Sequence, residues 1–303
     1  MKFEIGEVLS RALQITWKHK VLWLFSALPV LVSFLVFPIM IVPFFFLGVD
    51  SQGTPVIFEN PILIALFVGL NIAISVLGFV LYAAGSTCTT LGILHAEEGA
   101  GPLTAAGLFN EGMKYFVRIL GVVLLVNVGV STVFFAFFMC MALFGLVTMG
   151  MGFICAQPLI ILLYPVMMVL YAFIEQSQAA VVADDLGIIE AISRGWDLVK
   201  AHFWRILLIS LIVYFGITVA SSIVFLPFMA PLFFLPFFME TSQIETSLRA
   251  FGWILAAFGV VFLPVMALFQ GITITFMKST YVLVYLRLTR NQETRNTAVT
   301  VNA

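Results

Sequence analysis

One kind of segment occurs three times in this chain, and each copy leads directly into long apolar runs. The first copy begins Glu7-Val-Leu-Ser-Arg and the last begins Glu190-Ala-Ile-Ser-Arg. The middle copy is tied to the last by its exit, because Phe-Val-Arg118-Ile-Leu matches Phe-Trp-Arg205-Ile-Leu. A charged segment that repeats before paired apolar runs predicts a membrane protein built from a repeated unit.

The apolar runs determine the fold class. Hydrophobic residues make up 62% of the chain and charged residues only 10%, whereas soluble proteins are about one quarter charged. The runs exceed the roughly 20 residues that a helix needs to cross about 30 Å of hydrocarbon. They are continuous and show no alternation with a period of two, which favours helices over barrel strands. The predicted fold is therefore an all-α, polytopic membrane protein.

Six transmembrane helices are predicted, and the basic residues orient them. The spans lie at about 21–48, 61–85, 119–146, 153–176, 206–238 and 250–277. Every Lys and Arg except Arg249 lies in the N-terminus, in 86–118, in 177–205, or from Lys278 onward. Positive residues mark the cytoplasmic side of a membrane, so both termini are expected in the cytoplasm.

The spans are expected to form three pseudo-repeats in a single membrane domain, residues 1–290. The repeats cover about 3–98, 101–185 and 187–290, and each is led by a cytoplasmic amphipathic helix lying in the interface. In the first and last of these helices, apolar residues recur at helical spacing and are expected to face inward. They are Ile5, Val8, Leu9, Ala12, Leu13 and Trp17 in the first and Ile189, Ile192, Trp196, Val199 and Phe203 in the last. Residues 291–303 are polar and are expected to be a disordered cytoplasmic tail.

The fifth span is too long for an untilted crossing, because 33 residues would make a helix of roughly 50 Å. Three prolines fall in its outer part: Pro227, Pro231 and Pro236. Proline removes a backbone hydrogen bond and kinks helices. These residues are therefore expected to break the outer end, which would bend, re-enter the membrane or lie along the interface.

Two ionisable residues, Glu175 and Lys278, end the fourth and sixth spans at equivalent positions of their repeats. We expect them to approach each other near the inner interface; the alternative is that each snorkels separately to water. Arg11, Arg118, Arg194 and Arg205 are candidates for contacts with lipid phosphates at the cytoplasmic leaflet. General positive-inside anchoring explains the same four arginines without a specific ligand.

Few polar residues fall near the middle of a span: Asn71, Asn127, Gln157 and Gln270. Such groups either form hydrogen bonds between helices or line a path through the membrane. The chain has no nucleophile and base motif, no phosphate-binding loop and no metal-ligand spacing. The prediction is a non-enzymatic protein without a cofactor or a metal site.

The chain resembles a group of bacterial and archaeal proteins described with the membrane domain of glycerophosphoryl diester phosphodiesterases. The resemblance rests on Gly6-Glu-Val-Leu-Ser-Arg-Ala, on Ala180-Val-Val-Ala-Asp-Asp-Leu-Gly and on Glu190-Ala-Ile-Ser-Arg-Gly-Trp-Asp-Leu-Val-Lys. In that family the phosphodiesterase chemistry belongs to a separate soluble domain, so no catalytic residue carries over. The resemblance implies a six-span module in the cytoplasmic membrane of a prokaryote.

The leading functional hypothesis is a non-enzymatic module that organises lipids or partner proteins at the cytoplasmic leaflet. It is motivated by the repeated interfacial helix and by the scarcity of polar groups at mid-depth. The alternatives are a small-molecule or lipid transporter and, less favoured, a membrane enzyme acting on lipid. The predicted partners are the lipid bilayer together with a protein partner or a second copy of the chain. No nucleic acid is expected.

Overall fold

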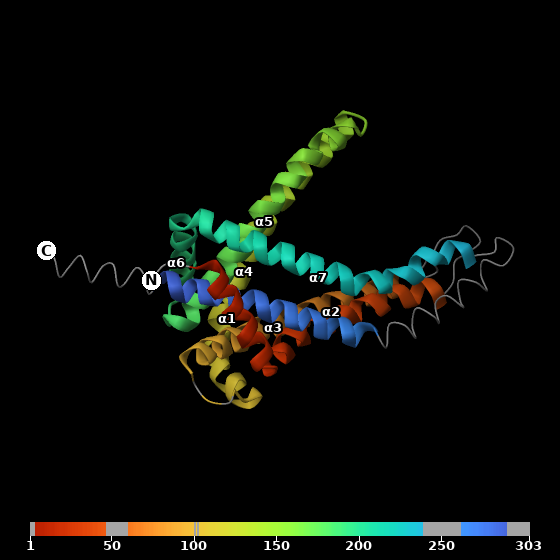
Figure 1. Cartoon of the computed structure of the whole chain (residues 1–303). Helices are drawn as coiled ribbons and strands as arrows, with labels where there is room; N and C mark the ends of the chain where they lie inside the picture. Colours follow the sequence, from red (N-terminus) through yellow and green to blue (C-terminus); the bar gives the residue numbers. More distant parts are fainter. Residues whose placement is uncertain (1–3, 47–59, 100, 102, 239–261, 290–303) are drawn as a thin grey trace. The chain divides into compact units, whose positions relative to one another are not determined.

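A computed structural model describes residues 4–46, 60–99, 101, 103–238 and 262–289 of the chain (Figure 1). Within these residues the regular structure is entirely helical, as predicted. The helices are α1 (Ile5–Lys18), α2 (Val21–Phe46), α3 (Pro61–Glu98), α4 (Ala105–Val147), α5 (Met151–Ala183), α6 (Ile188–Ala201), α7 (Phe203–Phe238) and a last helix over Phe262–Thr289.

Five of the described helices have segments long and apolar enough to cross a membrane: Pro61–Glu98, Ala105–Val147, Gln157–Ala183, Phe203–Leu226 and Phe262–Thr289. They indicate a multi-pass membrane protein. In α2 the assessed apolar stretch, Val21–Phe34, is shorter, so a sixth span stays a prediction. Residues 49–59 and 239–249, the first part of the span expected at 250–277, and the expected tail at 291–303 lie outside the described residues.

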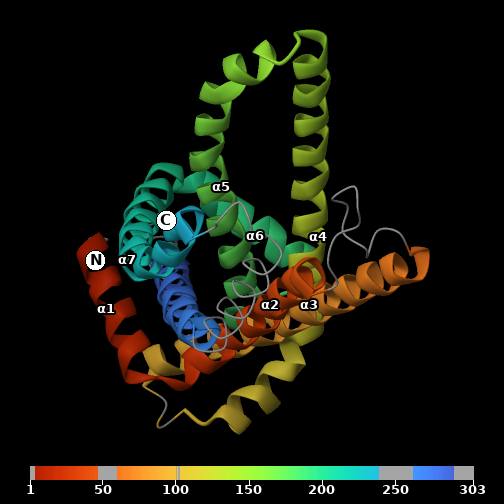
Figure 2. The same cartoon turned by 90° about the vertical axis from the view of Figure 1, so that its right-hand side faces the viewer.

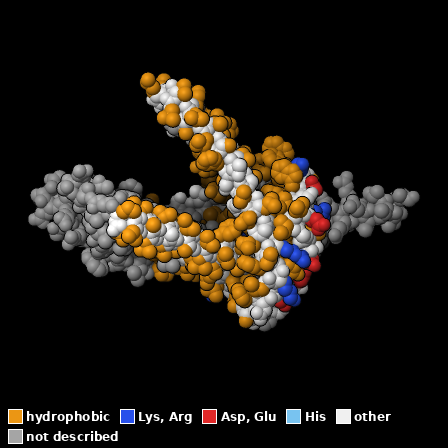
Figure 3. Space-filling model, turned by 180° about the vertical axis from the view of Figure 1, so that it is seen from behind, with side chains coloured by type: hydrophobic (Ala, Val, Ile, Leu, Met, Phe, Trp, Pro, Cys, Tyr) orange, Lys and Arg blue, Asp and Glu red, His pale blue; other side chains and the backbone are white. Residues whose placement is uncertain are grey.

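The chain divides into two compact units. Unit 1 contains residues 1–19, 86–216 and 276–303, and unit 2 contains residues 20–85 and 217–275. Among the described residues, every Asp, Glu, Lys and Arg except Lys20 belongs to unit 1. Most of these charges gather at the end of unit 1 where α1 and α6 lie (Figures 1 and 3).

The three copies of the charged segment form helices of two kinds. Helices α1 and α6 are separate helices, and each ends at a histidine with non-helical backbone angles, His19 and His202. The middle copy has no such break and continues into its span as the single 43-residue helix α4, capped by the Thr104 side chain. The prediction of a separate interfacial helix is therefore wrong for the middle copy. Tyr115 occupies the position aligned with His202, and helix α4 runs through it without a break.

The prolines do not end the helices as expected. Helix α7 continues through Pro227, Pro231 and Pro236 to Phe238, and α5 contains Pro158 and Pro165 in its interior. Membrane helices tolerate proline because neighbouring groups satisfy the freed backbone carbonyls. The expected break in the outer part of the fifth span is therefore not seen.

Helices α1 and α6 bury matching positions. When they are aligned on Glu7 and Glu190, the buried residues pair as Val8 with Ala191, Ala12 with Gly195, Ile15 with Leu198 and Thr16 with Val199. Of the residues expected to face inward, Val8, Ala12 and Val199 are buried, whereas larger ones such as Leu13 (48%) and the aligned Trp196 (43%) are exposed. The predicted face is therefore correct in part, and the large side chains assigned to it are left facing outward, as is common where helices pack closely in membranes.

Glycines allow the closest helix contacts in both units. In unit 1, a Cβ on Gly195 would lie 2.3 Å from Ser177 Oγ and 3.0 Å from the Ser177 nitrogen. In unit 2, a Cβ on Gly85 would lie 2.3 Å from the Phe25 carbonyl oxygen, and one on Gly271 would lie 2.7 Å from the Trp23 carbonyl oxygen. Helix α2 therefore packs its backbone against α3 and against the last helix.

A tight turn joins α4 to α5 at residues 148–150 (Figure 2). Gly150 has a φ of 93° and Met149 a φ of 50°, both in the left-handed region that favours glycine. The neighbouring Leu146, Val147 and Met151 are all exposed. The tip of this helical hairpin is thus apolar and lacks any charged side chain.

The close approach of α6 to α5 predicts an asymmetry between two glycines of unit 1. Gly195→Ala should lower stability by about 1–3 kcal/mol because the new methyl group overlaps Ser177. Gly216→Ala is the matched control, since no atom lies within 4 Å of its Cβ position, and it should be neutral or slightly stabilising. Thermal unfolding of the purified protein in detergent measures both. Equal midpoints for the two variants would contradict the packing described here.

Candidate functional site

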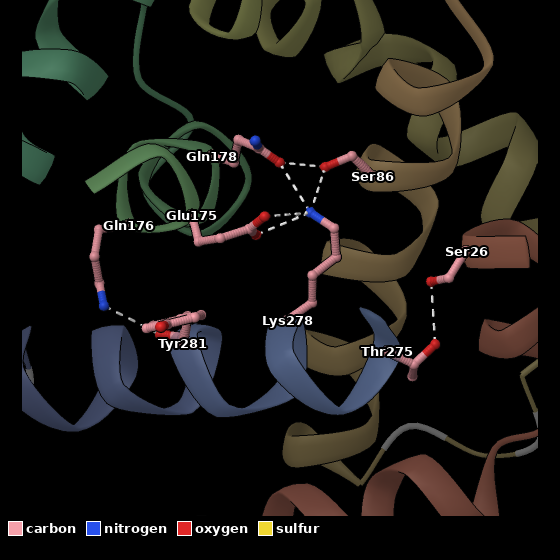
Figure 4. Close-up of polar contacts among 8 residues, drawn as sticks. All are labelled: Ser26, Ser86, Glu175, Gln176, Gln178, Thr275, Lys278 and Tyr281. Atoms are coloured by element: carbon pink, nitrogen blue, oxygen red, sulfur yellow. Dashed lines mark hydrogen bonds and ion pairs between the residues drawn. The ribbon is translucent and has the colours of Figure 1, made fainter. Parts of the chain in front are cut away.

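A buried polar cluster in unit 1 joins three helices, and we call its four residues the Lys278 network. Lys278 Nζ donates to Glu175 Oε2 at 2.8 Å, to Ser86 Oγ at 2.7 Å and to Gln178 Oε1 at 3.2 Å (Figure 4). Ser86 in turn donates to the Gln178 side-chain oxygen. Ser86 comes from α3, Glu175 and Gln178 from α5, and Lys278 from the last helix.

The network is sealed from the surface. Lys278 is 1% exposed, and Glu175 and Gln178 are 0% exposed. A buried charge is tolerated when it is paired and when its remaining hydrogen-bonding groups find partners. The ammonium group has three protons, and the network supplies acceptors on three different side chains. The arrangement fixes the register of the three helices around one charge pair.

Tyrosines extend this cluster toward α7 and toward the charged end of unit 1. The Tyr281 hydroxyl donates to Ser210 Oγ at 3.0 Å, and the Gln176 amide donates to the Tyr281 carbonyl oxygen at 3.3 Å. One turn further along the last helix, the Tyr285 hydroxyl donates to Asp184 Oδ2 at 2.5 Å. The last helix therefore makes polar contacts with α5 at several levels.

Some buried polar atoms in and beside the network have no hydrogen-bond partner among the described residues. They are Thr90 Oγ1, Gln176 Oε1, Gln178 Nε2 and Ser279 Oγ. Buried polar atoms are usually hydrogen-bonded, and an unpaired one costs about 1–3 kcal/mol. The combination of a buried ion pair with unused donors and acceptors is the strongest chemical feature of the described membrane helices.

The structure brings Glu175 and Lys278 together in direct contact, and the separate snorkelling of each side chain is not seen. Ser86 and Gln178 were not singled out by the sequence analysis. A signal for both was present, because each of the three helices carries a polar run at this level: 86–87 in α3, 175–178 in α5 and 278–280 in the last helix. Alignment of all three span exits would have identified them.

The four arginines considered for lipid contacts differ in their surroundings. Arg11 pairs with Glu97 at 2.9 Å and Arg118 pairs with Asp185 at 2.6 Å. Arg194 lies against the Tyr285 hydroxyl, and Arg205 is exposed. A further ion pair, between Arg287 and Glu7 at 2.9 Å, replaces the contact of Glu7 with Arg11 that helical spacing suggests. These pairs connect α1 and α4 to the ends of the other helices.

The polar residues at mid-span are not gathered into one lining within a unit. Asn71 and Gln270 belong to unit 2, whereas Asn127 and Gln157 belong to unit 1. Asn71 donates to the Phe67 carbonyl, and Asn127 donates to the Val123 carbonyl, both at 2.8 Å within their own helices. Gln157 is exposed and Gln270 is half-buried. The two asparagines thus satisfy their amides locally.

Within the described residues, no group of three or more His, Cys, Asp or Glu side chains is placed to hold a metal ion. The cysteines Cys88 and Cys140 are free thiols, one buried and one exposed. The two candidate functional sites are therefore the Lys278 network and the charged end of unit 1.

The burial of the Lys278 network predicts a large and non-additive response to mutation. Glu175→Gln and Lys278→Met should each lower stability by about 3–5 kcal/mol, because the remaining charge is buried without its partner. The double variant Glu175→Gln/Lys278→Met closes the cycle and should cost well below the sum of the two single losses. Arg11→Gln, which breaks a half-exposed pair, is the control and should cost at most about 1 kcal/mol. Urea or thermal unfolding measures all four; strict additivity would contradict a coupled pair.

The ion pair of Glu7 with Arg287 predicts a pH dependence. The hydrogen bond from Arg287 and its positive charge hold the pKa of Glu7 below its ordinary value of 4.5. A lowered carboxyl pKa in the folded state contributes stability above the unfolded-state value, and this contribution is lost as pH falls through the folded-state pKa. Wild type should therefore exceed Glu7→Gln in thermal midpoint at pH 7, and the difference should shrink progressively as pH falls below 4.5. A difference that is unchanged with pH would contradict this.

Comparisons of the chain with protein-family models, with curated proteins and with solved structures find no match. The resemblance to the glycerophosphoryl diester phosphodiesterase membrane domain therefore stays a prediction that rests on the sequence motifs alone. The function has to be argued from the Lys278 network and from the charged end of unit 1, because no relative supplies it.

Proposed function

We propose that this protein is a non-enzymatic membrane module that organises anionic lipids at the cytoplasmic leaflet. The observation that carries the proposal is the separation of charge between the units: among the described residues, Lys20 is the one charged residue outside unit 1. Within unit 1 the charges gather at the end formed by α1 and α6 (Figure 3). The described residues of unit 1 carry ten acidic and nine basic side chains, so their net charge does not attract anionic lipid. The attraction is proposed for the exposed cations that have no acidic partner, each worth about 1 kcal/mol near the inner surface of a membrane.

The faces of α1 and α6 support an interfacial position. Each helix has a buried face of small and aliphatic residues, a charged face, and a third face with large exposed apolar side chains such as Leu13 and Trp196. Trp17 and Trp204 are also exposed, by 55% and 78%. Tryptophan concentrates at the boundary between lipid and water. A helix with these faces is suited to lie between headgroups and acyl chains.

The same proposal includes the orientation and the setting of the protein. The positive-inside rule puts both termini in the cytoplasm, and the motif resemblance implies the cytoplasmic membrane of a prokaryote. A protein partner or a second copy of the chain could share the exposed apolar helix faces with lipid. Pairing of Arg11 and Arg118 with acidic residues leaves exposed cations such as Lys18, Lys200 and Arg205 as the leading lipid contacts.

Lipid selectivity tests this function directly. The purified chain is reconstituted in phosphatidylcholine bilayers with trace spin-labelled phosphatidylglycerol or spin-labelled phosphatidylcholine. The motion-restricted fraction should be larger for phosphatidylglycerol, and high salt should remove the difference because it screens exposed charges. The variant Arg205→Gln should reduce the preference. Equal motion-restricted fractions for the two lipids in low salt would contradict the proposal.

The alternative is a transporter for a small polar solute, and the Lys278 network is the observation that favours it. Ionisable groups buried in membrane helices mark substrate paths in many proteins, and Gln176 and Gln178 retain unused polar atoms beside this pair. Proteoliposomes that accumulate a solute when wild type is present, but not when Lys278→Met is present, would establish this alternative. Absence of flux for amino acid, sugar and phosphate panels would favour the lipid module.

A further inference from the structure

A partly open cavity of about 510 Å³ lies at the C-terminal end of α1 in unit 1. Its lining is contributed by one stripe of α1, by the residues that follow it and by Ala96 near the end of α3; the members are Arg11, Gln14, Ile15, Trp17, Lys18, His19 and Ala96. Arg11, Ile15 and Lys18 share a stripe because residues three or four apart lie on one helix face. The volume falls within the range of pockets that hold small ligands.

The lining carries positive charge and many hydrogen-bond donors. Arg11 donates from its Nε to Glu97 Oε2 and from one terminal nitrogen to Gln14 Oε1 at 3.5 Å, which leaves its second terminal nitrogen for another acceptor. Lys18 is exposed and makes no ion pair with any residue that the structure describes. Gln14 adds a neutral amide. Glu97 offsets part of the Arg11 charge, so Lys18 is the main uncompensated cation of the cavity.

The environment of His19 is consistent with this charge. Partial burial, followed by the positive charges of Lys18 and Arg11, holds the pKa of His19 below its ordinary value of 6.5. The imidazole is therefore largely neutral at pH 7 and offers one donor and one acceptor. The cavity also comes directly before the apolar segment that starts at Val21, and Trp17 belongs to its lining. Both features place it at the depth of lipid headgroups.

We infer that this cavity binds a phosphate group, with Lys18 and Arg11 as its charged contacts and the headgroup of an anionic phospholipid as its source. The inference rests on the proposed function and names the site at which one lipid would be held. Lysine and arginine are the usual partners of phosphate, since charge-assisted hydrogen bonds to it are stronger than neutral ones. Other exposed cations would attract lipid without a cavity around it.

The test uses the full chain in detergent and counts bound phosphatidylglycerol and phosphatidylcholine by native mass spectrometry. Lys18→Gln removes the charge and should weaken phosphatidylglycerol binding about fivefold. Ala96→Leu keeps every charge but fills the cavity, and it should weaken binding at least as much. Lys114→Gln is the matched control, because Lys114 is an exposed cation of unit 1 outside the cavity, and it should leave binding unchanged.

The outcomes separate the site from the function and identify the source of the phosphate. Inorganic phosphate, titrated by calorimetry, should bind weakly and should not displace phosphatidylglycerol if the headgroup is the ligand; full displacement would support a soluble phosphate at the same site. Unchanged phosphatidylglycerol binding in both Lys18→Gln and Ala96→Leu would overturn the site. If phosphatidylglycerol binding were unchanged in both variants and the spin-label preference for this lipid also persisted, the cavity would be excluded as the binding site while the lipid module would stand.

Discussion

The structure of unit 1 depends on pairing a charge that has been removed from water. Lys278 is only 1% exposed, and an unpaired ammonium group would be too costly to bury there. Glu175 supplies the opposite charge, and Ser86 and Gln178 accept hydrogen bonds from the other N–H groups of the ammonium. Because these partners come from α3 and α5, the last helix can occupy only a register that brings all of them together. Apolar packing alone would not specify that register so narrowly.

Small residues play the complementary role where no charge is involved. Gly195 lets α6 approach Ser177 of α5, and Gly112 lets α4 approach Cys88 of α3. Between lipid-facing helices there is little hydrophobic driving force, so close backbone contact and polar pairing hold the helices together. This explains why the bulky side chains of α1 and α6 point outward. The exposed apolar area is the surface that a bilayer would cover.

Much of the fold follows from the sequence, and the errors have physical causes. Continuous apolar runs predicted the helices, and the aligned exits of two spans predicted that Glu175 would approach Lys278. The middle charged segment was expected to be a separate helix, yet it continues into α4 because it lacks the break that occurs at His19 and His202. The inward faces were predicted correctly at Val8, Ala12 and Val199 but not at Leu13 or Trp196, because hydrophobicity alone does not distinguish a packed position from one that faces lipid. Ser86 was missed because the polar run that contains it was not compared with the polar runs at the ends of the fourth and sixth spans.

The apolar tip between α4 and α5 bears on how the protein enters its membrane. Two helices joined by a three-residue turn can enter the bilayer as a pair, since each helix satisfies its own backbone hydrogen bonds. In the proposed orientation the turn around Met149 and Gly150 must cross to the far leaflet during biogenesis. No charged side chain would cross the hydrocarbon together with this turn. Moving a charged side chain through the hydrocarbon is the main energetic barrier to inserting such a hairpin. The hairpin is therefore a self-contained unit for membrane integration, and through Glu175 of α5 it also supplies one partner of the ion pair that fixes the register of the last helix.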